Sequence, residues 1–409
     1  MAKKAQNAAL LLSHALTDEK NQALENMAHS LRKNSKKIIT ANQKDLAMGK
    51  GKKLSKALSD RLLLDEERIE KMAYSLEEII KLPDPVGKII QEWQPANRIQ
   101  FKKIRIPIGV IGIIYESRPN VTADAAGLCL KSGNAVILRG GSEAFHSNQI
   151  LISLLSQAIQ EANLPKESIQ GPSSQDRKVI DHLLKLDSYI DLIIPRGGQA
   201  LVERVVQKSR IPVLKHFKGI CHLYLDESAN PQMALDITLN AKVQRPGVCN
   251  AIETLLVHKS LQKSILSGIL QSLLESGVEI RADKELQNQF PKIKLVKEKD
   301  FGNEFLDLIL PIKIVSSIDE AIEHIQKYGS KHTEGIVTEN QENAERFIKE
   351  LDSSCIFVNA STRFADGGEM GMGAEIGIST SKIHAFGPMG LEDLTIARYV
   401  GYGEGQIRT

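Results

Sequence analysis

Residues 108–144 read IGVIGIIYESRPNVTADAAGLCLKSGNAVILRGGSEA, in which two apolar runs flank a helical pattern. The runs at 108–115 and 135–139 have the length and composition of buried strands, and the segment near 121–132 is expected to be a helix. Strands that alternate with helices form parallel sheets covered on both faces. This stretch therefore predicts an α/β fold.

The same alternation continues along the chain and then starts a second time. Helices are expected near 146–162, 199–208, 231–242, 260–275, 319–328 and 340–350, and strands at 189–195, 222–226, directly after Cys249, 307–315, 335–338 and 355–361. A chain of 409 residues is too long for one ordinary core. We therefore expect two α/β domains in tandem.

The N-terminal part has a different character. Apolar residues recur at intervals of three and four up to residue 82, which predicts successive helices, and the LPDP sequence at 82–85 ends them. The segment NRIQFKKIRIP, 97–107, alternates apolar and polar residues as an edge or hairpin strand does.

The composition is that of a soluble globular protein, with 42% hydrophobic and 25% charged residues. The four cysteines stand far apart with no CxxC motif, which predicts neither a disulfide framework nor a zinc site and fits a reducing compartment. The longest apolar run is the 10-residue stretch 106–115, whereas a membrane span needs about 20 residues. We expect a cytoplasmic protein without a membrane partner.

The charge pattern gives little support for a polyanion partner. The net charge is +3, and the stretch 31–56 holds nine Lys or Arg residues against the single acidic residue Asp45. A nucleic-acid or membrane patch is one interpretation, and a solvated helix face is the other. No aromatic residue is interleaved in the stretch, so we favour the helix face and expect no nucleic-acid partner.

Cys249 is the candidate nucleophile. It lies in NAKVQRPGVCNAIETLLVH, 240–258, where a Pro-Gly turn precedes an apolar β-type run. Such a turn fixes a thiol and leaves one face open, and either Arg245 or a helix N-terminus would favour the thiolate. The alternative is a small buried hydrophobe, which is the commoner role of a cysteine thiol.

Polar residues follow the strands where α/β proteins place ligands. Asn120 is a candidate oxyanion donor or a helix cap. Gly140 and Gly141 permit close approach of a nucleotide or form a plain turn. Gly197 and Gly198 precede a helix, whose N-terminal N–H groups suit a pyrophosphate, although the GxGxxG fingerprint is absent.

The segment 301–338 contains Glu304, His324 and His332. No pair of His, Asp or Glu residues there has a convincing metal spacing, so no metal is expected. For His324, a surface or packing role is favoured over catalysis.

Taken in order, these segments resemble the aldehyde dehydrogenase superfamily and, within it, the gamma-glutamyl phosphate reductase family. The similarity covers nearly the whole chain and includes RPNVTADAAGLCLKSGNAVILRGG, YIDLIIPRGG, PGVCN and the pattern of His324-Ile325, Tyr328-Gly329-Ser330 and His332-Thr333-Glu334. The resemblance implies that Cys249 is the nucleophile, that Asn120 binds the oxyanion and that Glu304 binds the nicotinamide ribose.

The resemblance also implies the reaction, which is reduction of gamma-glutamyl phosphate by NADPH to glutamate-5-semialdehyde and phosphate through a Cys249 thioester, the second step of proline biosynthesis. Arg118, Arg245 and Arg363 are nominated for the substrate phosphate and carboxylate. Hydrolytic relatives carry a glutamate base, whereas this sequence has Leu214 near that position. A phosphate nucleophile needs no such base.

The nucleotide turn indicates the cofactor. NAD-preferring relatives carry an acidic residue three positions after the basic residue of this turn, and here Arg139 is followed at that distance by Ser142. Arg139 and Ser142 therefore favour the 2′-phosphate of NADP(H), with Glu143 as a competitor for the site.

The implied domain plan has three parts. Residues 1–92 and 106–221 would form the NADP-binding domain, 222–393 the catalytic domain, and 93–105 with 394–409 an oligomerisation hairpin and tail. A homo-oligomer and functional coupling to glutamate 5-kinase are expected. Two alternatives stay open: an acylating dehydrogenase that uses coenzyme A, and a non-catalytic nucleotide-binding relative.

Overall fold

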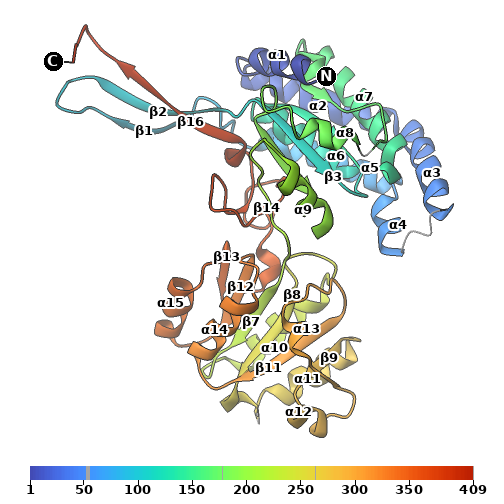
Figure 1. Ribbon diagram of the computed structural model, residues 1–409, viewed down its shortest axis with the longest axis vertical. Helices are drawn as coiled ribbons and strands as arrows, with labels where there is room; N and C mark the ends of the chain where they lie inside the picture. Colours follow the sequence, from blue (N-terminus) through green and yellow to red (C-terminus); the bar gives the residue numbers. More distant parts are fainter. Residues whose placement is uncertain (52–55, 177, 263, 409) are drawn as a thin grey trace. The chain divides into compact units, whose positions relative to one another are not determined.

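The computed structural model describes residues 1–51, 56–176, 178–262 and 264–408. The chain divides into two compact units, which are described separately (Figure 1). Unit 1 comprises Met1–Lys215, Gly371–Gly377 and Met389–Thr409, and unit 2 comprises His216–Met370 and Ile378–Pro388. Each unit contains a parallel sheet with helices packed on it, which confirms the predicted α/β fold.

Unit 1 begins with the predicted series of helices, α1 (Ala2–Leu12), α2 (Thr17–Lys33), α3 (Ser35–Gly51), α4 (Lys56–Leu62) and α5 (Glu66–Lys81). The Asp65 carboxylate caps α5 by accepting a hydrogen bond from the Arg68 N–H at 2.8 Å. The helix ends at Lys81 because Pro83 favours an extended conformation at Leu82.

The sheet of unit 1 has the strand order β5-β4-β3-β6, and its paired strands are parallel. The strands are β3 (Val110–Tyr115), β4 (Ala135–Arg139), β5 (Ile169–Gln170) and β6 (Leu192–Arg196). One face packs against α1, α8 (Lys178–Leu183) and α9 (Gln199–Lys208). On the other side α6 (Asn120–Lys131) and α7 (Phe145–Glu161) lie between the sheet and the helices α2 and α5.

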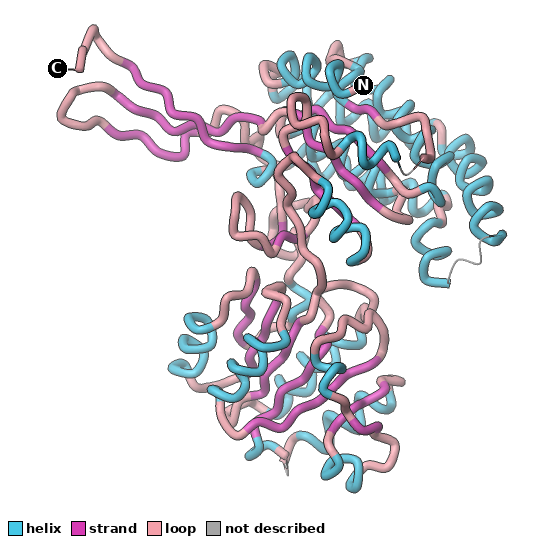
Figure 2. The backbone as a smooth tube through the Cα atoms, viewed as in Figure 1, coloured by secondary structure: helices cyan, strands magenta, loops and turns pink. Residues whose placement is uncertain are grey.

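A separate antiparallel sheet extends from unit 1 (Figure 2). Its strands are β1 (Ile89–Trp93), β2 (Gln100–Pro107) and β16 (Thr395–Tyr402), in the order β1-β2-β16. β2 confirms the alternating strand predicted at 97–107, and its pairing with β16 confirms the C-terminal tail as its partner. Trp93 stacks on Phe101 with ring centroids 5.6 Å apart, which fixes the register of β1 against β2.

The sheet of unit 2 is also parallel, with the order β10-β9-β11-β8-β7-β12-β13. Its strands are β7 (Cys221–Leu225), β8 (Ile252–His258), β9 (Glu279–Ala282), β10 (Lys294–Leu295), β11 (Ile309–Val315), β12 (Thr333–Val337) and β13 (Cys355–Val358). Its helices are α10 (Pro231–Val243), α11 (Leu266–Glu275), α12 (Lys284–Gln289), α13 (Glu298–Phe301), α14 (Ile318–Tyr328) and α15 (Gln341–Glu350).

Alternate residues of the central strands pack into two apolar layers. Leu223 and Leu255 lie in a cluster with α10 and α11, whereas Tyr224 and Leu256 lie in a second cluster with α14 and α15. This alternation follows from the two-residue period of a strand. Because both faces are covered, the central strands are largely apolar, as the sequence indicates. Their buried polar side chains are exceptions, among them His222 and Glu334, which hydrogen-bond to each other at 2.9 Å.

The structure differs from the sequence-based expectation in several short elements. The strands β9 and β10 and the helices α8, α12 and α13 were not expected, because each is six residues or shorter and too short to show a period. β8 begins at Ile252, so Cys249 lies before the strand, as the sequence indicates.

The domain plan also needs a correction near its end. Gly371–Gly377 and the segment from Met389 belong to unit 1, although the sequence analysis assigned 222–393 to the catalytic domain. The cause is local packing: Gly373 lies against the Leu82 side chain, and the Asn134 amide donates a hydrogen bond to the Leu394 carbonyl at 2.8 Å.

Part of the basic stretch, residues 52–55, lies outside the described residues. In its described part, Arg32 pairs with Glu70 at 2.6 Å and also with Glu77, and the buried Asp45 carboxylate accepts hydrogen bonds from the backbone and hydroxyl of Ser147. These contacts join α2 to α5 and α3 to α7, so the described part of the stretch belongs to packed helices. Among the helices of the described ranges, none is long and apolar enough to cross a membrane.

Candidate active site

The polar segments of unit 1 share the carboxyl edge of its sheet. β3 leads into 116–120, β4 into 140–142 and β6 into 197–198, and the strands are neighbours in the order β4-β3-β6. Parallel strands end at a common edge, so the three segments lie together there.

Asn120 is exposed and is the first residue of α6. The N-cap position belongs to Pro119, so the structure does not support the helix-cap alternative for Asn120. Its Nδ2 donates a hydrogen bond to Asp124 Oδ2 at 3.1 Å. A side-chain amide has two N–H donors, so this contact leaves the second one for another acceptor.

Arg139 ends β4 and is buried, with 6% of its surface exposed. Its guanidinium donates hydrogen bonds to the carbonyls of Gly140 and Gln175, the latter at 3.2 Å. Arg139 lines a pocket together with Gly140, Ser142 and Asn148. A guanidinium, a hydroxyl and an amide on one wall are suited to an anionic oxygen.

Ser117 binds the carboxylate of Glu143, the residue expected to compete for the 2′-phosphate site. Its Oε1 accepts hydrogen bonds from the Ser117 N–H and hydroxyl, each at 2.7 Å. A Cβ at Gly141 would come within 2.0 Å of the same carboxylate oxygen, so glycine at 141 makes room for this arrangement. The competitor expected from the sequence is therefore engaged within the turn.

Gly197 and Gly198 lead into α9 as predicted. The Gly198 N–H donates a hydrogen bond at 2.8 Å to a carboxylate oxygen of the exposed Glu116. The N-terminus of α9 thus already binds an oxyanion, and a phosphate oxygen at this position would replace Glu116.

The candidate residues of unit 2 lie at the amino edge of its sheet, where the strands begin. His216 precedes β7, Cys249 precedes β8, Glu304 precedes β11 and His332 precedes β12. These strands are parallel and adjacent, so their amino ends meet at one edge. Four segments that are far apart in the sequence, one of which holds Cys249, therefore meet at this edge.

Gly219 connects Glu304 to Cys249. A Cβ on Gly219 would lie 2.2 Å from the Cys249 carbonyl oxygen, so the two backbones are in close contact. The Gly219 N–H donates a hydrogen bond to Glu304 Oε1 at 2.8 Å. Burial raises the pKa of Glu304, while this hydrogen bond and the charge of Lys218 oppose the shift.

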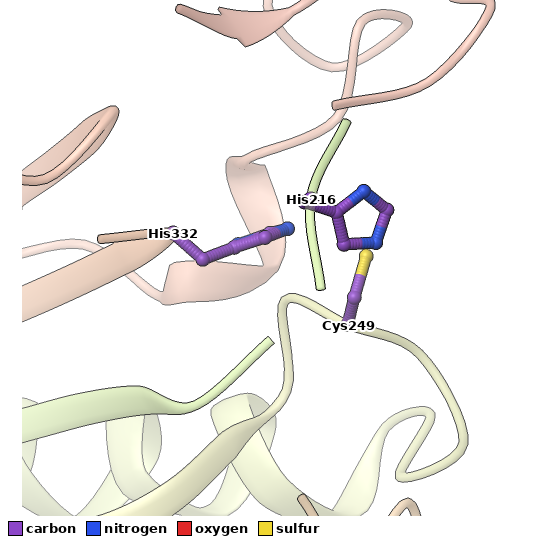
Figure 3. A group of neighbouring side chains, drawn as sticks. All are labelled: His216, Cys249 and His332. Carbon is purple, nitrogen blue, oxygen red and sulfur yellow. The ribbon is translucent and has the colours of Figure 1, made fainter. Parts of the chain in front are cut away.

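Two histidines flank the Cys249 thiol (Figure 3). One ligand atom each of His216, Cys249 and His332 lies within 4.8 Å of the others. The Nδ1 of His216 is 2.9 Å from the Ile378 carbonyl oxygen, which can only accept, so this nitrogen carries a hydrogen. Figure 3 shows the other ring nitrogen of His216 beside the sulfur.

The candidate arginines divide between the units. Arg118 lies in unit 1, and Arg245 and Arg363 lie in unit 2 with Cys249. Burial and the charge of Arg245 lower the pKa of Arg363, whereas the charges of Asp366 and Cys249 oppose the shift. Arg363 Nε also donates a hydrogen bond to Gln244 Oε1 at 2.9 Å. The Arg363 guanidinium therefore contributes positive charge near the thiol, and the charge of Arg245 acts on Arg363.

No helix begins at Cys249 in the described part of the chain. Cys249 follows the C-terminal end of α10 and precedes β8. All four cysteines carry thiols rather than disulfides. Cys249 is half-buried, whereas burial raises the pKa of Cys129 and Cys221.

His216 is the residue that the sequence analysis missed. Leu214, near the position of the glutamate base of hydrolytic dehydrogenases, is buried, and His216 stands two residues later. A basic side chain in the same stretch was the available signal. The His324 ring, by contrast, packs edge-on against the Phe301 ring, with the ring centroids 4.8 Å apart. Burial lowers the pKa of His324 to about 3. His324 therefore has the expected packing role, but it is buried rather than at the surface.

Comparison with known proteins shows the family to which the chain belongs. The model of the aldehyde dehydrogenase family matches residues 1–290. A gamma-glutamyl phosphate reductase from Caldanaerobacter subterraneus is 53% identical over 407 residues, covering 100% of this chain and 98% of the relative. The chain belongs to the gamma-glutamyl phosphate reductase family. It is thus an enzyme of the aldehyde dehydrogenase family.

Solved structures agree with this assignment. The crystal structure of a gamma-glutamyl phosphate reductase from Thermotoga maritima has a TM-score of 0.97 and 44% identity, covering 100% of this chain and 99% of that one. An acetylating aldehyde dehydrogenase from Geobacillus thermoglucosidasius, at 18% identity, has a TM-score of 0.71 and covers 100% of this chain and 96% of that one. The second likeness concerns the fold alone.

The packing of Gly219 against Cys249 leads to a first prediction. Gly219→Ala should move the thiol away from His216 and lower turnover about 100-fold, since small displacements of reacting groups have effects of this size. The rate at which iodoacetamide alkylates Cys249 should fall as well, and thermal melting would check the fold.

The matched control is Gly268→Ala in α11. A Cβ at Gly268 meets no heavy atom within 4 Å, so both turnover and alkylation should stay at the wild-type level. Wild-type alkylation and turnover in a folded Gly219→Ala protein would contradict the inferred contact.

Proposed function

We propose that this protein reduces gamma-glutamyl phosphate with NADPH to glutamate-5-semialdehyde and phosphate, a step in proline biosynthesis. The observation that carries the proposal is the half-buried Cys249 thiol beside His216, within the electrostatic influence of Arg363, at an edge shared with Glu304. Proteins named gamma-glutamyl phosphate reductase match the whole chain, which supports this proposal.

Cys249 acts as the nucleophile in this proposal. The Nε2 atom of His216 accepts the thiol proton, because Nδ1 donates to the Ile378 carbonyl and leaves Nε2 with its lone pair. The thiolate attacks the acyl carbon, a thioester forms, and phosphate leaves with the bonding electrons. Arg245 and Arg363 bind oxygens of the leaving phosphate or of the substrate carboxylate, and Arg118 is the third candidate.

Asn120 and the Cys249 N–H hold the tetrahedral oxyanion in this mechanism. Each donor stabilises such a transition state by about 3 kcal/mol. The exposed Asn120 amide keeps a second N–H beyond the one that Asp124 accepts, which supports this role.

The thioester must survive until it is reduced. Leu214, near the position of the glutamate base of hydrolytic relatives, is a buried apolar residue. A carboxylate there would activate water against the thioester, so its replacement favours reduction over hydrolysis.

Aldehyde dehydrogenases use nicotinamide cofactors, and the residues of unit 1 fit NADPH. The hydride that reduces the thioester comes from NADPH when it is bound. Arg139 and Ser142 in the pocket beside β4 would hold the 2′-phosphate, with Gly140 and Gly141 forming the turn. Gly197 and Gly198 would receive the pyrophosphate, and Glu304 the nicotinamide ribose.

Replacing the nucleophile tests the mechanism. Cys249→Ala should abolish turnover while NADPH still binds, because the residues proposed for the 2′-phosphate and the pyrophosphate lie in unit 1 and the change leaves Glu304 in place. The assay oxidises chemically prepared glutamate semialdehyde with NADP⁺ in the presence of phosphate. Cys355→Ala is the control, since Cys355 is buried in β13 and should tolerate the change.

The same assay separates the alternatives. Replacement of phosphate by coenzyme A should give no acyl transfer. Activity only with coenzyme A would identify a dehydrogenase that transfers its acyl group to coenzyme A. No turnover with either acceptor would identify a non-catalytic relative. More than a few per cent of wild-type activity in Cys249→Ala would exclude the covalent mechanism.

The second test of function concerns the cofactor. The kcat/KM with NADPH should exceed that with NADH at least tenfold, because charge-assisted hydrogen bonds to the 2′-phosphate are worth about 1.5 to 3 kcal/mol. Arg139→Ala should remove most of the preference. Since Arg139 is buried and could be needed for folding, Ser142→Asp provides an independent variant, in which the carboxylate should repel the 2′-phosphate. Equal use of NADH by the wild type would refute this role.

We also propose a homo-oligomer formed through the three-stranded sheet. β1 and β16 are its edges, and exposed apolar side chains such as Ile90, Ile396 and Tyr399 lie along them. Exposed strand edges pair readily with another chain.

Light scattering at micromolar concentration should therefore find a dimer or larger. Ile90→Lys should shift the protein toward monomer, because a charged side chain on an edge strand opposes pairing. Leu10→Lys, at an exposed apolar position on α1, is the control and should leave the mass unchanged. A monomeric wild type would rule out the proposal.

The proposed reaction belongs in the cytoplasm, where reducing conditions keep the nucleophile as a thiol. Functional coupling to glutamate 5-kinase is part of the same proposal, since that enzyme would supply the acyl phosphate.

A further inference from the structure

Cys249, His216 and His332 make a set of side chains that suits a metal ion. They come from the segments before β8, β7 and β12, and one ligand atom of each lies within 4.8 Å of the other two (Figure 3). The sequence-based expectation of no metal rested on local spacing, which cannot detect ligands from three separate segments.

We propose that this cluster binds a thiophilic divalent cation, Zn²⁺ being the best match, and that the bound ion masks the nucleophile. One thiolate and two imidazoles are a ligand set that zinc favours over magnesium or calcium, which prefer oxygen. Coordination replaces the thiol proton, which is released to solvent.

The surroundings of the two histidines orient them for this role. His216 Nδ1 donates to the Ile378 carbonyl at 2.9 Å, so Nε2 is the ligand atom. His332 Nδ1 is 2.8 Å from Thr333 Oγ1 and 3.7 Å from Cys221 Sγ, so its Nε2 is also the atom directed to the ion. Metal-binding histidines characteristically use one ring nitrogen for such a supporting contact.

The distances require a small adjustment. Zinc bonds of about 2.3 Å to sulfur and about 2.0 to 2.1 Å to nitrogen place tetrahedral ligand atoms about 3.3 to 3.6 Å apart. Side-chain rotation that brings the atoms about 1 Å closer completes the site. Three protein ligands leave a fourth position for water, and coordination engages one lone pair of the sulfur and lowers its nucleophilicity.

Cobalt titration tests the coordination without reference to turnover. Protein freed of metal by a chelator is titrated with Co²⁺, and Zn²⁺ then competes for the site. One ion per chain and a thiolate-to-cobalt absorption band are expected, and the band should be missing in Cys249→Ala. His216→Gln and His332→Gln should each weaken the affinity at least tenfold.

Two comparisons keep the result specific. His14→Gln removes an exposed histidine after α1 and should leave affinity unchanged. Because His332 is buried, thermal melting must show that its variant is folded, and the half-buried His216 provides the independent variant. Absence of binding, binding without the thiolate band, or wild-type affinity in Cys249→Ala or in folded His216→Gln would overturn the proposal.

The functional consequence rests on the proposed function and has its own measurement. Zn²⁺ should inhibit NADP⁺-dependent oxidation of the semialdehyde at the concentration at which it displaces Co²⁺ from the cluster. A chelator should reverse this inhibition. Metal binding with an inactive wild type would refute the proposed function alone. Full activity with the site filled would overturn the masking of Cys249.

Discussion

The contact between Gly219 and Cys249 is the constraint on which the site of unit 2 depends. A side chain at 219 would overlap the Cys249 carbonyl oxygen, so only glycine lets the segment before β7 lie against the turn before β8. The same glycine donates its N–H to Glu304. The thiol, the candidate ribose ligand and His216 are thereby placed by one short stretch of backbone.

The two sheets present their functional groups at different ends. In unit 1 the polar segments follow β3, β4 and β6, at the carboxyl edge where helix N-termini and glycine turns can receive phosphate groups. In unit 2 the thiol and the two histidines precede β8, β7 and β12, at the amino edge. Cys249 follows the C-terminal end of α10 along the chain, and the charge of Cys249 acts on the Arg363 guanidinium.

Burial distinguishes Cys249 from the other three thiols. Cys129, Cys221 and Cys355 are buried, and Cys129 and Cys221 have raised thiol pKa values because of burial. Cys249 alone is half-buried, beside an imidazole with a defined hydrogen on Nδ1. Cys221 also supports the site, since its Sγ donates to the Cys249 carbonyl oxygen at 3.1 Å. The same imidazoles that suit a reactive thiol make a site for a soft metal ion.

The sequence by itself determined the α/β class, the order of the long strands and helices, the pairing of 97–107 with the C-terminal tail, and the family. Apolar runs and helical periods are local signals, and motif residues stand next to one another in the chain, so both can be recognised without coordinates. Elements of six residues or fewer were missed because a period needs more residues to show. The tertiary structure alone decided that His216 and His332 meet at Cys249, that Glu143 is held by Ser117, and that Gly371–Gly377 returns to unit 1. These contacts join residues far apart along the chain, and only the parallel register of the strands and the packing of their connecting segments bring such residues together.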